Sequence, residues 1–196
     1  MTQSGADLAS APPCIVSVVG LKKSGKTTVV TALVAELRSR GHHVSTLKKM
    51  EYAALFLDQE GTDTRLHADA GAEVVVALLA GETVRFERSG RAGSLRDLLR
   101  LFPRDTGFLV CEGMVDSSAA QLVVLCLRSL DDLTDALEVR GIERGSVVAV
   151  SGVAAAAGAV KEGVPGLPGV PAFDSLDAAQ RRALADLVIK KACPGA

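Results

Sequence analysis

The residues between Gly20 and Thr27 have the types and the spacing needed to hold a phosphate chain. Gly20 is followed by four residues and then by Gly25, Lys26 and Thr27, which is the pattern G-x-x-x-x-G-K-S/T. Glycines let the backbone adopt a positive φ, so that successive N–H groups can turn toward an anion. The Lys26 ammonium would reach the β- and γ-phosphates, and the Thr27 hydroxyl would bind Mg²⁺. The pattern predicts a Walker A loop, with Lys26 as a catalytic residue.

The rest of this loop is predicted to take part in nucleotide binding. Its backbone amides would wrap the phosphates at the positive end of the helix that follows. Lys22 and Lys23 lie inside the loop and would add positive charge, although solvated lysines in a surface turn are the alternative interpretation. The predicted nucleotide-binding residues are Gly20, Lys22, Lys23, Ser24, Gly25, Lys26, Thr27, Thr28, Lys48 and His67.

Glu112 is the predicted acidic partner for the metal and a predicted catalytic residue. The run 108–111 before it is apolar, and Gly113 after it lets the chain turn away. Open α/β sheets bind ligands at the carboxyl ends of their strands, and a P-loop needs an acidic group for Mg²⁺ at such a position. We predict Thr27 and Glu112 as metal residues. An ordinary loop carboxylate is the alternative interpretation of Glu112.

Three further residues are candidates for the chemistry. Asp63, a predicted catalytic residue, and His67 are four apart in a predicted helix, so they share a face. From that face they could orient water, assist Mg²⁺ or contact a second substrate near the γ-phosphate. A helix cap for Asp63 and a surface histidine for His67 are the alternatives. Lys48 ends a predicted strand, where it would neutralise phosphate charge, whereas Lys49 is more readily explained as an exposed lysine.

Strands and helical patterns alternate along the chain, and these elements would position the residues above. The predicted helices cover 26–40, 62–70, 94–102, 129–139 and a terminal segment capped by Asp174 or Ser175. The predicted strands cover 14–19, 43–47, 73–79, 83–88, 108–111, 121–127 and 146–150. This order predicts an α/β fold with a doubly wound, mostly parallel sheet of the P-loop NTPase type. The hairpin 73–88 would be an antiparallel extension at one edge, where subunits could pair.

Composition limits the classes of partner. The 196 residues suit a single P-loop domain over 13–196, preceded by a flexible tail over 1–12. The core must be aliphatic, because 48% of residues are hydrophobic but only 3% are aromatic. The net charge of -1 gives no case for nucleic acid or an anionic membrane. Without an apolar run of spanning length or a secretory signal, we expect a cytoplasmic protein. The four cysteines form no C-x-x-C pair and are expected to be small hydrophobic residues.

Four segments together resemble one family. They are Val-Gly-Leu-Lys-Lys-Ser-Gly-Lys-Thr-Thr (19–28), Ser-Thr-Leu-Lys (45–48), Gly-Thr-Asp-Thr-Arg-Leu-His-Ala-Asp-Ala-Gly-Ala (61–72) and Val-Cys-Glu-Gly (110–113). The combination resembles the molybdopterin-guanine dinucleotide biosynthesis protein MobB over about residues 14–127, with a looser likeness at 169–174. The 61–72 stretch and the later Glu-Gly make the likeness more specific than a P-loop alone.

The resemblance implies a cytoplasmic, homodimeric, GTP-binding protein with weak Mg²⁺-dependent GTPase activity. It also implies an accessory role beside MobA, the guanylyltransferase that joins GMP to molybdopterin. Lys26 and Thr27 match the family's phosphate and Mg²⁺ residues, and Asp63, His67 and Glu112 match the motif residues near them. Members usually have a histidine-rich stretch after the lysine of the second strand, whereas this chain continues with Lys-Met-Glu-Tyr over 49–52.

Other function classes and the identity of the base stay open at this point. A P-loop small-molecule kinase would need an arginine-bearing lid, for which Arg85, Arg88 and Arg91 are the candidates. A nickel-inserting or other metal-cofactor assembly NTPase would be expected to carry a His-rich tail or paired cysteines. The N-K-x-D motif that reads guanine in common GTPases is absent. Backbone groups of Ser151 and Gly152 could read the base instead, so ATP is an alternative to GTP.

Overall fold

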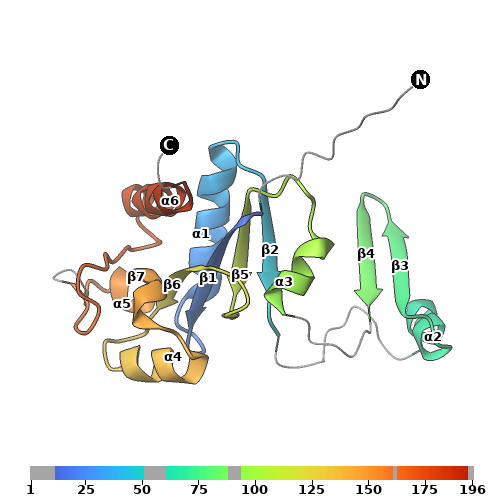
Figure 1. The fold of residues 1–196 in the computed structure, drawn as a ribbon, viewed down its shortest axis with the longest axis horizontal. Helices are drawn as coiled ribbons and strands as arrows, with labels where there is room; N and C mark the ends of the chain where they lie inside the picture. The colour runs from blue at the N-terminus through green and yellow to red at the C-terminus, as the bar shows by residue number, and fades with distance from the viewer. Residues whose placement is uncertain (1–11, 51–60, 88–93, 161–162, 194–196) are drawn as a thin grey trace.

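The computed structural model describes residues 12–50, 61–87, 94–160 and 163–193, and its main body is a five-stranded parallel sheet. The strands lie in the order β2-β5-β1-β6-β7 (Figure 1). Their bounds are β1 Cys14–Gly20, β2 Val44–Lys48, β5 Phe108–Glu112, β6 Leu122–Cys126 and β7 Val147–Ser151. The predicted mostly parallel α/β sheet is confirmed, and β1 occupies its centre with β5 and β6 as neighbours.

Alternating residues of the strands fill two apolar layers, one on each face of the sheet. Val16 and Val18 of β1 face helices α1 (Lys26–Ser39) and α6 (Ala178–Ala192). Ile15 and Val19 of β1 face the other side of the sheet, which α3 (Leu95–Leu98), α4 (Asp132–Arg140) and α5 (Val153–Ala156) cover. Consecutive side chains of a strand point to opposite faces, so a strand covered on both sides is mostly apolar. The aliphatic composition of the chain is explained by this arrangement.

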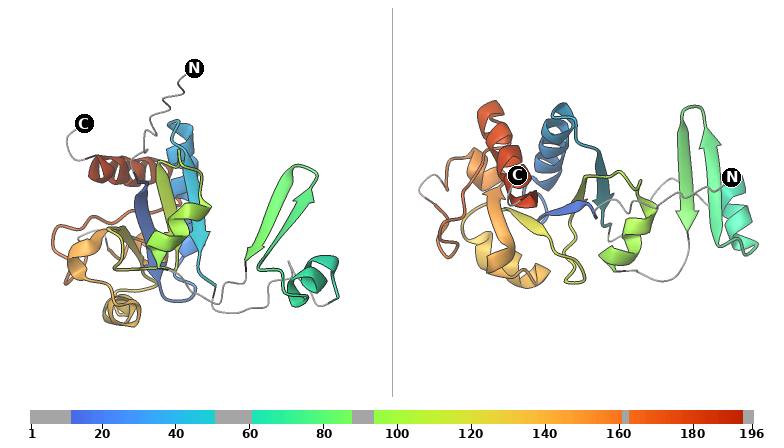
Figure 2. Two further views of the ribbon diagram at one scale, coloured as in Figure 1. Left: turned by 45° about the vertical axis from the view of Figure 1, so that its right-hand side comes forward. Right: turned by 45° about the horizontal axis from the view of Figure 1, so that its top comes forward.

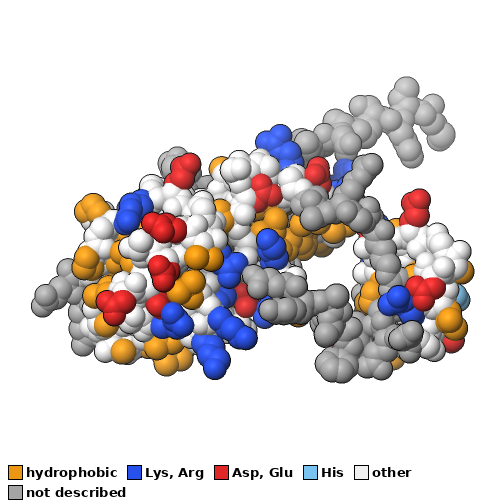
Figure 3. Space-filling model, turned by 90° about the horizontal axis from the view of Figure 1, so that it is seen from below, with side chains coloured by type: hydrophobic (Ala, Val, Ile, Leu, Met, Phe, Trp, Pro, Cys, Tyr) orange, Lys and Arg blue, Asp and Glu red, His pale blue; other side chains and the backbone are white. Residues whose placement is uncertain are grey.

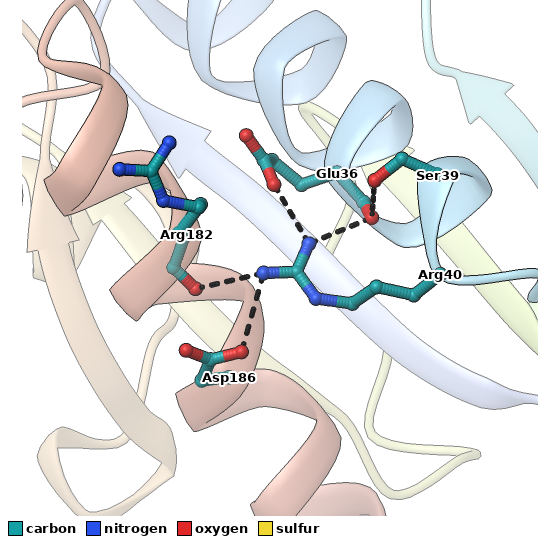
Figure 4. Close-up of polar contacts among 5 residues, drawn as sticks. All are labelled: Glu36, Ser39, Arg40, Arg182 and Asp186. Atoms are coloured by element: carbon teal, nitrogen blue, oxygen red, sulfur yellow. Dashed lines mark hydrogen bonds and ion pairs between the residues drawn. The ribbon is translucent and has the colours of Figure 1, made fainter.

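Arg40 connects the two helices of the first layer (Figure 4). Its guanidinium donates to the Glu36 carboxylate at 2.7 Å and to the Asp186 carboxylate of α6 at 3.2 Å. It also donates to the backbone carbonyls of Glu36 and Arg182. Surface ion pairs contribute little to stability by themselves, about 0 to 1 kcal/mol. The apolar contact of Leu33 and Leu37 with Leu184 and Val188 therefore carries most of the α1–α6 packing.

Most predicted elements are confirmed, with differences at their ends. The terminal helix begins at Ala178, and its cap is Asp177, whose carboxylate accepts the backbone N–H of Gln180 at 2.9 Å. The predicted caps were wrong, because Asp174 instead accepts the N–H of Leu176 in the preceding turn. Helix α4 begins at Asp132 rather than at the predicted residue 129. The predicted start at Ser94 is confirmed as a capping box, in which Ser94 and Asp97 cap each other's backbone.

A second unit stands apart from the five-stranded sheet in every view (Figures 1 and 2). It consists of α2 (Asp63–Asp69) and the antiparallel hairpin of β3 (Val74–Leu79) and β4 (Glu82–Glu87). The predicted hairpin is therefore present, but it forms its own two-stranded sheet instead of adding strands to an edge of the main sheet. At its base, Glu87 accepts from Arg85 of the hairpin and from Arg100 of the main body, at 2.7 and 3.2 Å.

Two further expectations concern the chain as a whole. The predicted flexible tail lies outside the described residues except for Pro12. Within the described residues, no helix has both the length and the apolar character needed to cross a membrane.

Candidate functional site

The loop between β1 and α1 has the backbone shape predicted for a Walker A loop. Gly20 ends β1 with φ 152°, and Gly25 caps the first turn of α1 with φ 89°. A Cβ on Gly20 would lie 2.1 Å from the carbonyl oxygen of Cys126, the last residue of the neighbouring strand β6. Only glycine therefore fits at position 20, because the two backbones touch there. Lys23 is the one described non-glycine residue with positive φ, which marks the loop as locally strained.

The segment after β7 supports the loop from behind. The Val153 N–H donates to the carbonyl oxygen of Ser24 at 3.3 Å. A Cβ on Gly152 would lie 2.2 Å from that same oxygen, so this backbone contact also requires glycine. The Ser151 hydroxyl donates to the Phe173 carbonyl at 2.6 Å. The structure thus gives Gly152 a supporting role in shaping the P-loop.

Ser24 occupies the interior of the loop. Its side chain is fully buried, and its hydroxyl has no hydrogen-bond partner among the described residues. A buried hydroxyl without a partner costs about 1 to 3 kcal/mol. An anion in the loop would offer such a hydroxyl and the loop amides an acceptor, which fits the predicted phosphate site.

Lys26, Thr27, Lys48 and Glu112 converge beside this loop. The Thr27 hydroxyl donates to Glu112 Oε1 at 3.0 Å, and Lys48 Nζ lies 3.1 Å from the same oxygen. Lys26 Nζ donates to the loop carbonyl of Leu21 at 2.6 Å. Burial lowers the pKa of Lys26, because a buried ammonium loses hydration. The structure therefore brings together the four residues predicted for phosphate and metal binding from β2, β5 and the start of α1.

These groups open onto a pocket with a large excess of positive charge. It encloses about 360 Å³ and is lined by Lys22, Lys26, Lys48, Lys49, Glu112, Gly113 and Arg140. Five cationic side chains thus share the pocket with one carboxylate. Figure 3 views the molecule from below, where Lys and Arg side chains gather in the middle of the main body. Such a pocket would bind a ligand that carries several negative charges.

Arg140 is the residue of this pocket that the sequence motifs missed. It ends α4, outside any motif, and it lies 114 positions after Lys26 in the chain. A positively charged residue in the last turn of a helix is common, because it complements the helix dipole. Nothing in the local sequence therefore distinguishes Arg140 from an ordinary helix end.

Asp63 and His67 are not brought to the P-loop within this chain. Both are exposed residues of α2, in the unit that stands apart from the main sheet (Figures 1 and 2). The cap of α2 is Thr62, whose hydroxyl accepts the N–H of Arg65. The roles predicted for Asp63 and His67 near the γ-phosphate stay predictions.

Of the arginines predicted for a kinase lid, Arg85 is not among the residues that line the pocket. Arg85 pairs with Glu87 on β4. The other two candidates, at positions 88 and 91, lie outside the described residues.

The donor set at the loop fits Mg²⁺. Oxygen atoms of Thr27 and Glu112 lie together at the end of β5, and Mg²⁺ prefers one or two protein oxygens with phosphate oxygens and water. The described residues contain no group of three or more His, Cys, Asp or Glu side chains arranged for a metal ion. Cys111 and Cys126 are buried, and burial raises the pKa of each thiol to about 12. They are therefore neutral hydrophobic residues at neutral pH, as predicted.

Comparisons with known proteins agree with this geometry. Residues 15–141 match the family Molybdopterin guanine dinucleotide synthesis protein B, MobB. The crystal structure of Bacillus subtilis MobB is 25% identical with a TM-score of 0.65, and the match covers 89% of this chain and 97% of that one. The structure of a MobB protein homolog from Bacillus stearothermophilus is 22% identical with a TM-score of 0.62, over 90% and 98% of the two chains, and supports the fold alone. No curated protein matches the chain at a significant level.

A glycine series tests the backbone contact behind the loop. Gly152→Ala should destabilise the protein by about 3 kcal/mol or more, because it adds both a positive-φ strain and an overlap with the Ser24 carbonyl. Gly141→Ala has the strain without any neighbour within 4 Å and should cost about 1 kcal/mol. Gly145→Ala adds neither the positive-φ strain nor an overlap, so it should leave the free energy of unfolding unchanged. Urea denaturation measures all three, and equal values for positions 152 and 141 would contradict the close contact.

Proposed function

The chain belongs to the MobB family and takes part in molybdenum cofactor biosynthesis, and from this premise we propose that it binds GTP with Mg²⁺ as an accessory protein. The proposal depends above all on one observation, the convergence of Lys26, Thr27 and Glu112 on a pocket lined by five cationic side chains. A triphosphate would lie along the loop, with its charge shared by the loop amides, the Lys26 ammonium and the metal. The guanine in the family's name favours GTP over ATP.

Lys26, Thr27 and Glu112 would each have a different role in binding the nucleotide. Lys26 would exchange its hydrogen bond with the Leu21 carbonyl for phosphate oxygens. Thr27 and Glu112 would hold Mg²⁺, which when bound neutralises charge on the β- and γ-phosphates. Glu112 already shares one oxygen with Thr27 and Lys48, so it is held in place for this task rather than free to accept a proton from water. We therefore expect weak GTPase activity, since Asp63 and His67 are also remote from the loop in this chain.

A second phosphate-bearing ligand is part of the proposal. Lys48 and Lys49 extend the positive charge of the pocket beyond Lys26. Molybdopterin, which the family name includes, carries a phosphate that such lysines would neutralise. The proposed partner is a MobA-type guanylyltransferase in the cytoplasm. Binding of the nucleotide would control when this chain associates with that partner.

We propose that the hairpin joins two copies of the chain. Val74, Val76 and Leu78 alternate along β3, so they share one face, and their exposed fractions are 40%, 54% and 79%. The other face of β3 contains the buried Val75, and α2 packs against this strand. An exposed apolar strip beside the unpaired outer edges of a two-stranded sheet is suited to pairing with the same element of a second copy.

Lys26→Ala should weaken Mg²⁺-GTP binding on the order of 100-fold or more, because a charge-assisted hydrogen bond to phosphate is lost. Isothermal titration calorimetry measures the affinity. Lys190→Ala, which removes an exposed lysine of α6, is the matched control and should leave the affinity unchanged. Unaltered affinity in Lys26→Ala would refute the phosphate site.

Glu112→Gln should mainly reduce the effect of Mg²⁺ on nucleotide affinity. The amide keeps the size of the side chain but removes the negative charge that attracts the metal. Titrations of GTP with and without Mg²⁺ give the ratio of affinities, which should fall at least about tenfold in the variant. Glu138→Gln on the exposed side of α4 should retain the ratio of the unaltered protein. An unchanged ratio in Glu112→Gln would rule out the metal role.

Leu78→Lys should convert the proposed dimer into a monomer, because it buries a charge in the apolar strip of the hairpin. Light scattering coupled to size-exclusion chromatography measures the mass. Leu176→Lys changes a leucine that is also exposed, at 67%, but lies before α6, and it should leave the mass unchanged. A monomeric unaltered protein, or a dimer that survives Leu78→Lys, would contradict dimerisation through this face.

A further inference from the structure

Arg140 lies at the C-terminal end of α4 and lines the pocket beside the P-loop. It is the last residue of α4, and Gly141 ends the helix with a positive φ of 60°. Leu133, Ala136 and Leu137 of α4 are buried in the apolar layer, and Arg140 follows them by seven, four and three positions, so it continues the same face of the helix. Because the helix is anchored by this packing, the place from which the Arg140 side chain extends is fixed by the core of the protein.

The arginine comes from a different element than the other cations of the pocket. Lys48 and Glu112 come from β2 and β5, which lie on one side of β1. Helix α4 packs against β1, in the apolar layer that also contains Val123 and Leu125 of β6. Lys26 lies at the start of α1, and all four side chains line the same 360 Å³ pocket. Burial is the main cause of the lowered pKa of Lys26, and repulsion by the positive charge of Arg140 lowers it further.

We propose that Arg140 is a phosphate-binding residue that contacts the terminal phosphoryl group of the bound triphosphate. The proposal rests on the proposed nucleotide site. Lys26 of a P-loop reaches the β- and γ-phosphates, so a second cation in the same pocket meets the phosphate chain at that end. A guanidinium offers several N–H donors in a planar fork that matches two phosphate oxygens. Arg140 and Lys48 would then hold the terminal group from both sides.

The contact predicts discrimination between triphosphate and diphosphate. A diphosphate lacks the group that Arg140 would bind, whereas it keeps the groups bound by the loop amides and Lys26. The chain would therefore recognise its triphosphate state through a residue of α4, a helix that carries no nucleotide motif. An arginine that served only to end its helix would make no such distinction.

Arg140→Gln tests the contact by calorimetry with Mg²⁺-guanylyl imidodiphosphate and Mg²⁺-GDP. Affinity for the triphosphate analogue should fall about 10- to 100-fold, the range expected for a hydrogen bond to a charged group, with less than about threefold change for GDP. Arg140→Lys should lose less, because it keeps the charge without the fork. The matched control is Arg144→Gln, whose guanidinium donates to the Gly166 carbonyl and lies outside the pocket. It should change both affinities by less than about threefold.

The possible outcomes separate the hypotheses. Equal losses for the two nucleotides, no loss, or an equal effect of Arg144→Gln would overturn the inference while leaving the nucleotide site intact. Failure of the unaltered protein to bind either nucleotide would overturn the proposed function and the inference together. Thermal unfolding is measured first, and if Arg140→Gln does not fold, a triphosphate-selective loss in Arg140→Lys decides the question in the same way.

Discussion

Two backbone contacts leave no room for a side chain around the P-loop, and the geometry of the site depends on them. Gly20 touches the end of β6, and Gly152 touches the carbonyl of Ser24 from behind. The loop is thus in backbone contact with the end of β6 and with the segment that follows β7. A loop fixed in this way can keep its amides turned toward an anion without reorganising when the ligand arrives.

The second constraint is electrostatic. One carboxylate, Glu112, is surrounded by five cationic side chains in the pocket, and it already shares an oxygen with Thr27 and Lys48. Like charges at close range repel each other, so this arrangement is more favourable when an anion occupies the pocket. The folding energy needed to hold the cations together comes from the aliphatic layers on both faces of the sheet. The packing of the aliphatic layers and the binding of an anion are therefore coupled, because the same strands hold the charged side chains in the pocket.

The hairpin unit has a different physical character from the main body. Its strand β3 contains one buried side chain, Val75, contacts α2, and presents an exposed apolar strip of Val74, Val76 and Leu78. An isolated two-stranded hairpin is marginally stable in water, and a further surface is needed to cover it. Asp63 and His67 belong to this unit, so their distance from the P-loop in one chain is tied to how the unit is covered. A second copy of the chain would cover the apolar strip and would also determine where Asp63 and His67 lie relative to a P-loop.

Local patterns in the sequence were sufficient for the strands, the helices and the central loop. The spacing from Gly20 to Thr27, the apolar run that ends at Glu112 and the family resemblance each depend on residues close together in the chain, so the sequence could reveal them. Helix ends such as Asp177 were harder, because several nearby side chains compete for the same N–H groups. The paired strands of the hairpin were predicted, but their separation from the main sheet was not.

The tertiary structure decided how distant residues meet at the site, and it added Gly152 and Arg140 to those that the sequence predicted. Lys48 and Glu112 meet because β2 and β5 are neighbours in register, with these two residues directly paired. Gly152 supports the loop because β7 ends beside β6, and Arg140 joins the pocket because α4 packs against β1. No short-range pattern encodes such contacts, since they follow from the order of the strands and from the packing of a whole layer. The sequence by itself thus determined the phosphate-binding loop, and the fold determined which distant residues surround it.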